Sequence, residues 1–347
     1  MANLIGAGDR RCGATTTRSP DQSTVVQRGV VEDDPAPAGA APTDWSTSDD
    51  LIGQESDDQV IAVFDSGFGG LNILEALVDL LPGEHFVYLG DSKRSPYGDR
   101  EPAEVLAFSL EILAYLRTHY RLKLIVVACN TASAIALDAL RANSDVPVVG
   151  VIDAAVRAIG QATSTRRVGV VGTVATIRSG VYQRRLAHET VTAIACPGLV
   201  QYVETGAIDD PSLLELMRHL LEPMSIATVD TVLLACTHYP YLGAQFHEVL
   251  GDAVTLISSA EETAFEVREL LMGPGQVQST QGAVHVLCTG PVEDFQRIGR
   301  RLFNGTLDSI EHIELGDFAE ADHQWMMNQP AQPGSKKRQE YADDQAS

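Results

Sequence analysis

Two cysteines in matching sequence contexts are the residues of this chain whose type and spacing best suit chemistry. Cys129 follows the apolar run 124–128, and Cys236 follows the run 232–235, 107 positions further along the chain. An apolar run of this length that ends in small polar residues is typical of a buried strand. Because ligands of open α/β sheets bind at the carboxyl ends of the strands, the pattern predicts two thiols at ligand-binding edges.

The same offset relates a second pair of segments. Residues 61–66 and 168–173 are again 107 positions apart, and each is a strand-like run that leads into a turn of small and hydroxyl residues. Two strand ends in one register predict a chain built from two similar α/β halves. Each half would then offer one thiol to a shared cleft, and the active site would have pseudo-twofold symmetry.

A cysteine after an apolar strand is often only a small buried side chain, but two matched cases favour a function. Thr131 and Thr237 are expected at helix starts, where backbone N–H groups and the helix dipole lower a thiol pKa and hold a carboxylate. Two such thiols on opposite walls of a cleft would remove and return a proton on opposite faces of one carbon. This chemistry suits the inversion of an α-amino acid and needs no organic cofactor.

Asp65 and Ser66 end the first strand-like run and precede a glycine-rich turn, residues 67–70. One interpretation is a tight turn in which Asp65 caps the next helix. The turn does not match the dinucleotide-binding pattern GxGxxG, because Asn72 stands at the last glycine position. Asp65 fits better as a polar partner near Cys129 that orients the thiol or the ammonium group of a substrate.

Two further residues are candidates for proton transfer. His238 lies two positions after Cys236 and would be a proton partner on that side, although a lone histidine often has only a structural role. Glu204 reads as a solvated acid, except that it lies 107 positions after Tyr97, a residue in a turn expected to line the cleft.

Uncharged polar residues gather at the expected strand ends and helix starts. Each can cap a helix through its side chain, and each can also donate a hydrogen bond to a carboxylate without disturbing the thiols. These residues are Asn130, Thr131, Thr173, Thr176 and Thr237.

Composition narrows the function classes. A chain of 347 residues with 44% hydrophobic residues is expected to form two domains. Its formal net charge of -22 argues against nucleic acid or an anionic membrane as a partner, since both require basic patches. Because no apolar run reaches membrane-spanning length and the start does not resemble a signal peptide, the sequence predicts a cytoplasmic protein.

Cysteine and lysine usage bears on cofactors. The five cysteines are odd in number and include no CxxC, which favours free thiols over a disulfide framework or a closed zinc site. Of these, Cys12 is assigned to an N-terminal extension, and Cys196 and Cys288 to packing. Only Lys93 and Lys123 fall within the expected folded region, so a pyridoxal phosphate Schiff base is disfavoured.

Strand-like and helical patterns alternate through the middle of the chain, which predicts parallel, doubly wound sheets. Strands are expected at 60–64, 86–89, 123–128, 147–151, 167–171, 191–195, 231–235, 254–257, 283–288 and 310–315. Helices are expected at 70–80, 102–119, 131–141, 176–187, 211–226, 240–249, 260–272 and 291–302.

These patterns predict four regions. Residues 59–152 with 254–318 are expected to form the first α/β domain, and residues 153–253 the second. Residues 1–58 and 319–347 are rich in polar and small residues and are expected to be disordered.

At the candidate residues the chain resembles the glutamate racemases, cofactor-independent enzymes that supply D-glutamate for peptidoglycan. The resemblance spans residues 59–318 and is carried by IAVFDSGFGGL at 61–71, GDS at 90–92, PYG at 96–98, ACNTAS at 128–133, GT at 172–173 with TIRS at 176–179, ACTHYP at 235–240 and SAEET at 259–263. It implies two flavodoxin-like domains and frequent homodimers.

The resemblance also implies a two-base mechanism. Cys129 would act on D-glutamate with help from Asp65, and Cys236 would act on L-glutamate with help from Glu204 and His238. The residues implied to line the substrate pocket are Asp65, Ser66, Pro96, Tyr97, Gly98, Asn130, Thr131, Thr173, Thr176, Thr237 and His238.

Two departures and two alternatives remain at this stage. Phe68 stands where the family usually has a smaller aliphatic residue, and residues 93–95 alter the loop before Pro96. An aspartate or hydantoin racemase has a similar cysteine pair, although His238 and the start at Asp65 favour glutamate. A noncatalytic regulatory protein on the same scaffold, such as one acting on DNA gyrase, is the alternative from another class.

Overall fold

The computed structural model of the chain describes residues 59–271, 282–303 and 309–316. The extensions expected at 1–58 and 319–347 lie outside the described residues. All described residues fall within one compact unit, which contains two parallel sheets.

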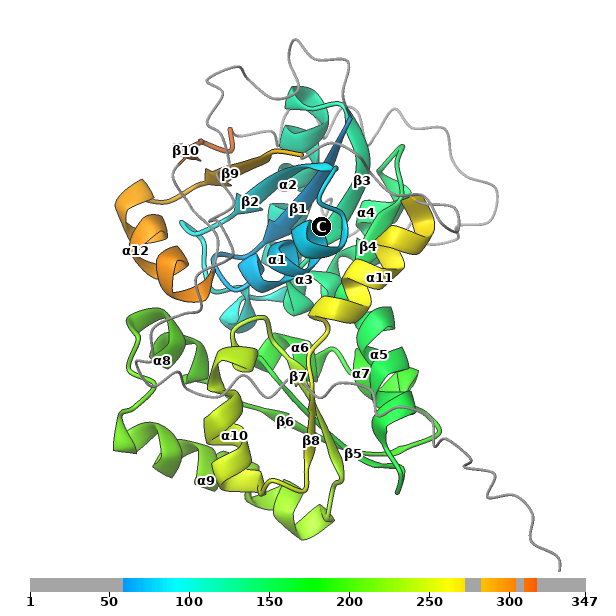
Figure 1. Cartoon of the computed structure of the whole chain (residues 1–347), viewed down its shortest axis with the longest axis vertical. Coiled ribbons are helices and arrows are strands. Elements are labelled where there is room, and N and C mark those ends of the chain that lie inside the picture. The colour runs from blue at the N-terminus through cyan, green and yellow to red at the C-terminus, as the bar shows by residue number, and fades with distance from the viewer. Residues whose placement is uncertain (1–58, 272–281, 304–308, 317–347) are drawn as a thin grey trace, which may run out of the picture. The chain divides into compact units, whose positions relative to one another are not determined.

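The first sheet has six parallel strands in the order β10-β9-β2-β1-β3-β4 (Figure 1). In β1 every residue is buried, as expected for a central parallel strand with helices on both faces. The strands are β1 (Val60–Asp65), β2 (His85–Gly90), β3 (Leu122–Val127), β4 (Val148–Gly150), β9 (Val284–Cys288) and β10 (Ile310–His312).

The second sheet has four parallel strands in the order β6-β5-β7-β8. They are β5 (Arg167–Gly172), β6 (Thr190–Ala195), β7 (Thr231–Ala235) and β8 (Thr255–Ile257). Their order repeats the order β2-β1-β3-β4 of the first sheet. Strand β5 lies 107 positions after β1, and β8 lies 107 positions after β4. The fold class expected from the sequence, α/β with two doubly wound parallel sheets, is therefore confirmed.

One strand assignment from the sequence is wrong. The strand at 254–257 was expected to belong to the first domain, but β8 pairs with β7 in the second sheet, with Thr231 opposite Thr255. The physical reason is the repeat itself, because β8 is the fourth strand of the second copy. The chain returns to the first sheet only after β8, and the other domain boundaries stay a prediction.

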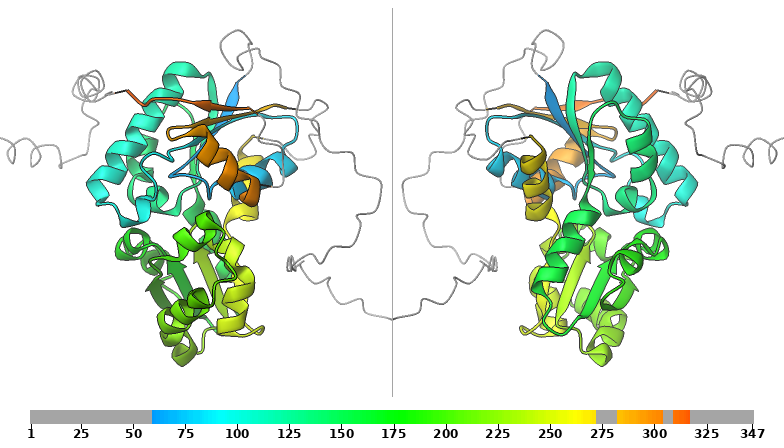
Figure 2. Two further views of the ribbon diagram at one scale, coloured as in Figure 1. Left: turned by 90° about the vertical axis from the view of Figure 1, so that its left-hand side faces the viewer. Right: turned by 90° about the vertical axis from the view of Figure 1, so that its right-hand side faces the viewer.

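Helices cover both faces of the first sheet, as Figure 2 shows. Helices α1 (Leu71–Leu80), α11 (Ala260–Leu271) and α12 (Val292–Leu302) pack on one face, where α1 and α11 lie side by side. Helices α2 (Pro102–His119) and α4 (Leu137–Ala142) pack on the other face, against Val60, Ala62 and Phe64.

The second sheet is covered in the same way. Helices α5 (Val151–Ala162) and α7 (Val181–Arg185) pack on the face that carries Val168 and Val170. Helices α8 (Leu199–Thr205), α9 (Pro211–Ala227) and α10 (Gly243–Leu250) pack on the face that carries Val232 and Leu234. The remaining short helices are α3 (Asn130–Ile135), α6 (Val174–Arg178), η1 (Tyr97–Asp99) and η2 (Tyr239–Leu242).

Several helices differ from the sequence expectation. The helix expected at 131–141 is divided at Ala136 into α3 and α4, and the one expected at 176–187 is divided at Gly180, which has φ +67°. That left-handed conformation interrupts a helix and is readily adopted by glycine. The patterns gave no helix at α5 or α8, although α5 leads from the first sheet to the second.

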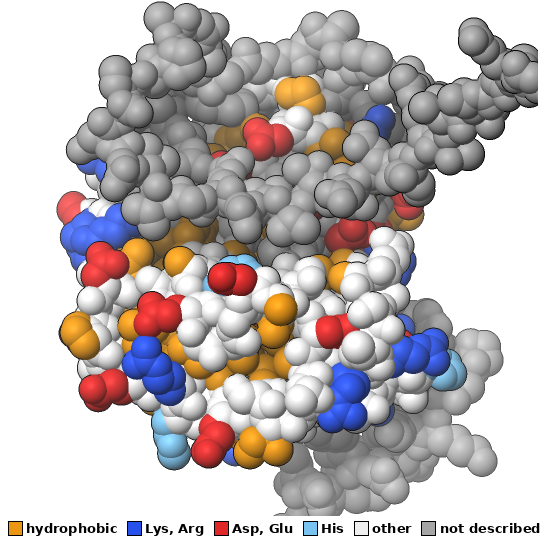
Figure 3. Space-filling model, turned by 60° about the horizontal axis from the view of Figure 1, so that its bottom comes forward, with side chains coloured by type: hydrophobic (Ala, Val, Ile, Leu, Met, Phe, Trp, Pro, Cys, Tyr) orange, Lys and Arg blue, Asp and Glu red, His pale blue; other side chains and the backbone are white. Residues whose placement is uncertain are grey.

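Among the described residues, none of the helices combines the length and apolarity that a membrane span requires. On the face drawn in Figure 3, acidic and basic side chains lie interspersed in the described part of the chain.

Candidate active site

Cys129 lies just beyond the carboxyl end of β3 and caps α3. Its Sγ accepts a hydrogen bond from the backbone N–H of Ala132 at 3.5 Å and donates one to Oγ of Ser66 at 3.6 Å. The side chain is 4% exposed. The thiol is therefore held at the strand edge by one bond from its own helix and one from the loop after β1.

The surroundings of Cys129 keep its thiol protonated. Burial, followed by the negative charge of Asp65, raises the pKa of Cys129 to about 12, against smaller lowering effects of the hydrogen bonds to Ala132 and Ser66. Placement at a helix start was expected to lower this pKa, but in this structure desolvation outweighs it. At neutral pH the thiol form of Cys129 is therefore favoured over the thiolate.

Asp65 ends β1 and is fully buried. Its Oδ2 accepts the backbone N–H of Gly67 at 2.9 Å, whereas Oδ1 has no hydrogen-bond partner among the described residues. Burial raises the pKa of Asp65, opposed by the charge of His238 and by backbone N–H groups. The carboxyl group thus interacts electrostatically with the thiol of Cys129 and with the imidazole of His238.

Cys236 occupies the matching position after β7. Its Sγ lies 4.0 Å from Nδ1 of His238, and its side chain is 6% exposed. The two thiols therefore have different neighbours: a carboxyl group near Cys129 and an imidazole beside Cys236.

His238 links Cys236 to Glu204. Its Nε2 lies 3.1 Å from Oε1 of Glu204, which makes an ion pair when the imidazole is protonated. Burial by itself lowers the pKa of His238, but the contacts with Cys236 and Glu204 outweigh it and raise the pKa to about 10. His238 is therefore an imidazolium at neutral pH. Gly206, at φ +75°, ends the helix that carries Glu204.

Both thiols line one small cavity. It measures about 10 Å³, which is room for about one water molecule. Its lining residues are Ser66, Pro96, Cys129, Asn130, Thr131, Val200, Cys236, Thr237 and His238. Residues that follow β1, β3 and β7 thus meet at one place, as the strand-edge argument predicted.

Three threonines form a hydrogen-bonded triangle between the two sheets. The Oγ1 atom of Thr131, after β3, lies 2.9 Å from that of Thr173 and 3.1 Å from that of Thr176, which both follow β5. The Oγ1 atoms of Thr173 and Thr176 lie 2.9 Å from each other, and the side chain of Thr173 caps α6. Of the three, only Thr131 is in the cavity lining, so the other two hold it in place.

Asn72 and Gly69 join the loop after β1 to the loop after β7. The side chain of Asn72 donates a hydrogen bond to the carbonyl of Thr237 at 3.0 Å. A Cβ on Gly69 would overlap the side chain of Thr237 and come within 2.6 Å of Nδ1 of His238. The closeness of these two loops depends on the absence of a side chain at Gly69.

The structure separates the expected pocket residues into two groups. Ser66, Pro96, Asn130, Thr237 and His238 are in the cavity lining together with Thr131 and the two thiols. Tyr97, Gly98, Thr173, Thr176, Asp65 and Glu204 are not in that lining.

Tyr97 and Gly98 directly follow Pro96, which lines the cavity, and lie in the short helix η1. The hydroxyl of Tyr97 donates to Oδ2 of Asp91 at 2.5 Å, so it is already occupied. A Cβ on Gly98 would lie 2.6 Å from Cβ of Thr173, which shows how closely this loop approaches the second sheet.

Sequence reasoning missed three residues near the site. Val200 lines the cavity from α8, Asn72 bonds the loop of Thr237, and the hydroxyl of Tyr182 donates to Oδ1 of Asn130 at 2.6 Å. For Asn72 the available signal was its place in the first turn of α1, two residues after the glycine-rich turn 67–70. Val200 and Tyr182 lie on helices with no motif that ties them to a cleft.

The remaining described cysteines lie outside the cavity lining. Cys196 and Cys288 are buried, and their thiols donate to the carbonyls of Ile194 at 3.8 Å and Gly290 at 3.3 Å. Cys12 lies outside the described residues. Within residues 59–271, 282–303 and 309–316, no cluster of three or more His, Cys, Asp or Glu side chains has the arrangement of a metal site.

Comparison with known proteins places this chain in a family. The profile of the family described as Asp/Glu/Hydantoin racemase matches residues 69–266. A glutamate racemase of Bacillus cereus is 38% identical over 267 residues, which cover 74% of this chain and 97% of the relative.

Solved structures give the same result. A glutamate racemase from Bacillus anthracis is 37% identical, with a TM-score of 0.70 over 74% of this chain and 98% of its own. A glutamate racemase from Francisella tularensis in complex with D-glutamate is 28% identical, with a TM-score of 0.70 over 76% of this chain and 100% of its own. The chain therefore belongs to the Asp/Glu/hydantoin racemase family of amino-acid racemases.

Proposed function

We propose that this chain is a glutamate racemase that interconverts L-glutamate and D-glutamate by direct proton transfer between Cys129 and Cys236. The observation that carries the proposal is that two thiols from the edges of two different sheets line one cavity. Named glutamate racemases among its relatives, one of them solved with D-glutamate, support the choice of substrate.

In the proposed reaction one cysteine begins as a thiolate and the other as a thiol. The thiolate takes the Cα proton of glutamate, and its electron pair stays on the substrate as a carbanion delocalised into the carboxylate. The opposite thiol then donates its proton to the other face of Cα. The product has inverted configuration, and the two cysteines have exchanged protonation states, so atoms and charge balance.

The neighbours of the two thiols suggest their roles. Cys129 with Asp65 would act on D-glutamate, and Cys236 with His238 and Glu204 on L-glutamate. As an imidazolium 4.0 Å from Sγ of Cys236, His238 can supply a proton to a thiolate formed there. The carboxyl group of Asp65 can orient Cys129 or accept from the substrate ammonium.

The rest of the cavity suits an amino acid with two carboxylates. Apart from the two thiols and His238, the polar side chains in its lining are uncharged donors, namely Ser66, Asn130, Thr131 and Thr237. Such groups bind carboxylates without supplying a competing base. We further propose that the enzyme works in the cytoplasm as a homodimer and supplies D-glutamate for peptidoglycan.

Exchange of the α-proton in D2O tests the mechanism directly. L- and D-glutamate are each incubated, without added cofactor, with the wild type, Cys129→Ala and Cys236→Ala. We expect the wild type to racemise both enantiomers with incorporation of deuterium, and each variant to lose about 10²–10⁴-fold or more in rate. Cys288→Ala is the matched control, because this thiol is buried away from the cavity lining.

The outcomes separate the alternatives. Near wild-type racemisation by either cavity variant contradicts the two-thiol mechanism. Turnover of aspartate in preference to glutamate would instead assign the chain to another activity of the family. Sedimentation of the purified chain as a monomer would contradict the proposed dimer alone.

A further inference from the structure

Tyr182 connects the core of the second sheet to the residue beside Cys129. It lies on α7 and packs with Val168, Val170 and Leu233. Its hydroxyl donates to Oδ1 of Asn130 at 2.6 Å. The bond therefore crosses from one sheet to the strand edge of the other and ends on a cavity-lining side chain.

The protonation of this hydroxyl is fixed by its surroundings. Tyr182 is 1% exposed, and burial raises its pKa, followed by the negative charges of Cys236 and Asp153. The group is consequently neutral at physiological pH. A neutral buried hydroxyl must place its single hydrogen on an acceptor, and Oδ1 of Asn130 is the acceptor in the structure.

This requirement determines which way the amide of Asn130 faces. With Oδ1 bound to Tyr182, Nδ2 is turned away, is buried, and has no hydrogen-bond partner among the described residues. Asn130 is 2% exposed and lines the cavity. Were the amide reversed, the hydroxyl hydrogen of Tyr182 would lose its acceptor, and an amide oxygen would replace the donor.

We propose that Tyr182 is a positioning residue that holds Nδ2 of Asn130 as a hydrogen-bond donor for a carboxylate of the substrate. This inference rests on the proposed function, since it needs a dicarboxylate in the cavity. It assigns to Tyr182 a preference for a carboxylate, both of whose charged oxygens accept from Nδ2, over a carboxamide, which accepts only through its neutral carbonyl oxygen. Tyr182 itself need not touch the substrate.

The first test is the replacement Tyr182→Phe, which removes the hydroxyl and keeps the ring. Because the carboxylate is present both in the bound substrate and in the transition state, we expect KM to rise about tenfold or more with a smaller change in kcat. Tyr120→Phe is the control, because its hydroxyl pairs with His285 and lies outside the cavity lining. Its kinetics should match the wild type.

A double-mutant cycle with Asn130→Ala separates positioning from general packing. If Tyr182 acts through Asn130, the Tyr182→Phe change should raise KM in the wild type but not in the Asn130→Ala background. Equal effects in both backgrounds would overturn the inference. Asn130→Asp serves as a second variant, because its carboxylate can still accept from Tyr182 but offers oxygen to the cavity. We expect this variant to fold like the wild type but to bind glutamate weakly.

Binding measurements provide a readout apart from turnover. Calorimetric titration with D-glutamate and with its α-amide and γ-amide gives the ratio of carboxylate to carboxamide affinity for each variant. For one of the two amides, we expect Tyr182→Phe to bring the ratio of carboxylate to carboxamide affinity closer to one. Without the hydroxyl of Tyr182, the side-chain amide of Asn130 can rotate and present its oxygen instead of Nδ2. An unchanged ratio overturns the role of Tyr182, whereas a wild type that neither binds nor racemises glutamate contradicts the proposed function itself.

Discussion

The thiols of Cys129 and Cys236 are chemically identical but have different neighbours. Cys129 lies near the carboxyl group of Asp65, and Cys236 lies beside the imidazolium of His238. A nearby negative charge disfavours a thiolate, whereas a nearby cation stabilises one. This asymmetry fits two bases that meet opposite faces of a chiral substrate, and it allows each side to be tested separately.

Replacing Asp65 with Asn should lower the pKa of Cys129 and still slow the reaction. Burial remains the larger cause of the raised pKa, but the carboxylate contribution disappears. The thiolate absorbance of the variant, corrected with Cys129→Ala, should therefore titrate at lower pH than in the wild type. Loss of an orienting carboxyl group should cost about 10²–10⁴-fold in turnover of D-glutamate.

The control for this substitution is Asp79→Asn, an exposed change on α1. A thiolate titration in Asp65→Asn that coincides with that of the wild type would show that Asp65 does not act on Cys129 electrostatically.

Glu204→Gln should weaken folding in a pH-dependent way. In the folded chain His238 has a pKa of about 10, above the unfolded value of about 6.5. Its pairing therefore stabilises the fold fully below the unfolded pKa, and this stability is lost as pH rises through the folded pKa. The difference in unfolding free energy between wild type and variant should be larger at about pH 6 than at about pH 10.

Urea unfolding at the two pH values measures this difference. Glu215→Gln, an exposed change on α9, should show no such pH dependence. If the wild type and Glu204→Gln differ equally at both pH values, the ion pair with His238 does not explain the raised pKa.

At the scale of elements, the site depends on how closely the loops after β1 and β7 approach each other. Gly69→Ala should separate them, because the new Cβ would overlap Thr237 and crowd His238. Overpacking of this kind costs about 1–3 kcal/mol of stability. Because His238 would also be displaced, we expect kcat to fall even under conditions in which the variant is fully folded. Racemisation rates and thermal unfolding of the variant measure the two effects.

Gly160→Ala is the matched control for that prediction. Gly160 lies inside α5, and a Cβ there would meet nothing within 4 Å. Because alanine favours a helix over glycine by about 1 kcal/mol, this variant should be as active as the wild type and equally or more stable. Wild-type activity in Gly69→Ala would mean that the loops tolerate greater separation than the structure suggests.

Helices and strands with a strong local sequence pattern could be predicted. The sheet that a short strand joins could not be predicted from that strand alone, because it depends on tertiary pairing. Apolar runs gave β1, β3 and β7, and α2 begins and ends where its pattern predicted. The strand β8 has only three residues, so its own composition could not say which sheet it joins. The 107-residue repeat did contain that information.

The site shows the same division. Asp65 ends a strand, and Cys129 and Cys236 lie just beyond the ends of two others, so one rule about strand edges predicted that they come together. Val200 and Tyr182 reach the cavity region from helices, and which side of a helix faces a cleft depends on tertiary packing that no local motif encodes.

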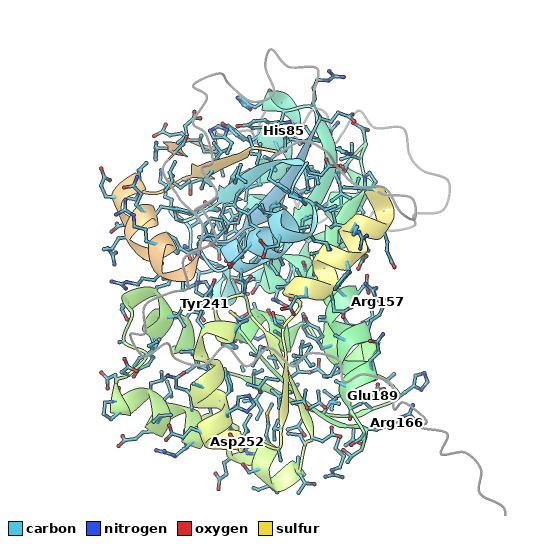
Figure 4. The ribbon with its side chains drawn as sticks, viewed as in Figure 1. His85, Arg157, Arg166, Glu189, Tyr241 and Asp252 are labelled. Carbon is cyan, nitrogen blue, oxygen red and sulfur yellow. The ribbon has the colours of Figure 1, made fainter. Side chains whose placement is uncertain are left out.

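At the scale of the whole molecule, several hydrogen bonds join the elements of the two sheets. Besides the threonine triangle, the hydroxyl of Tyr241, labelled in Figure 4, donates to the carbonyl of Leu302 at 2.5 Å. Arg157 on α5, also labelled there, pairs with Glu266 on α11 at 2.6 Å. The cavity in this arrangement has room for about one water, so it must widen before glutamate can enter.

Substrate entry is also governed by charge. The chain carries a formal net charge of -22 at pH 7, and glutamate is an anion at that pH. Long-range repulsion should therefore oppose association at low salt, and dissolved ions should screen it, since the screening length falls from about 30 Å at 0.01 M to about 8 Å at 0.15 M. Chemistry inside the buried cavity should be much less affected.

Raising ionic strength over this range should accordingly increase kcat/KM for both enantiomers of glutamate and leave kcat nearly constant. Steady-state racemisation at a series of sodium chloride concentrations measures the effect. Glutamine, which has no net charge at pH 7, is the control: its inhibition constant as a competitor should vary little with salt, because long-range repulsion does not act on it. A fall in kcat/KM with salt would indicate instead that a local positive potential at the cavity attracts the substrate more strongly than the net charge repels it.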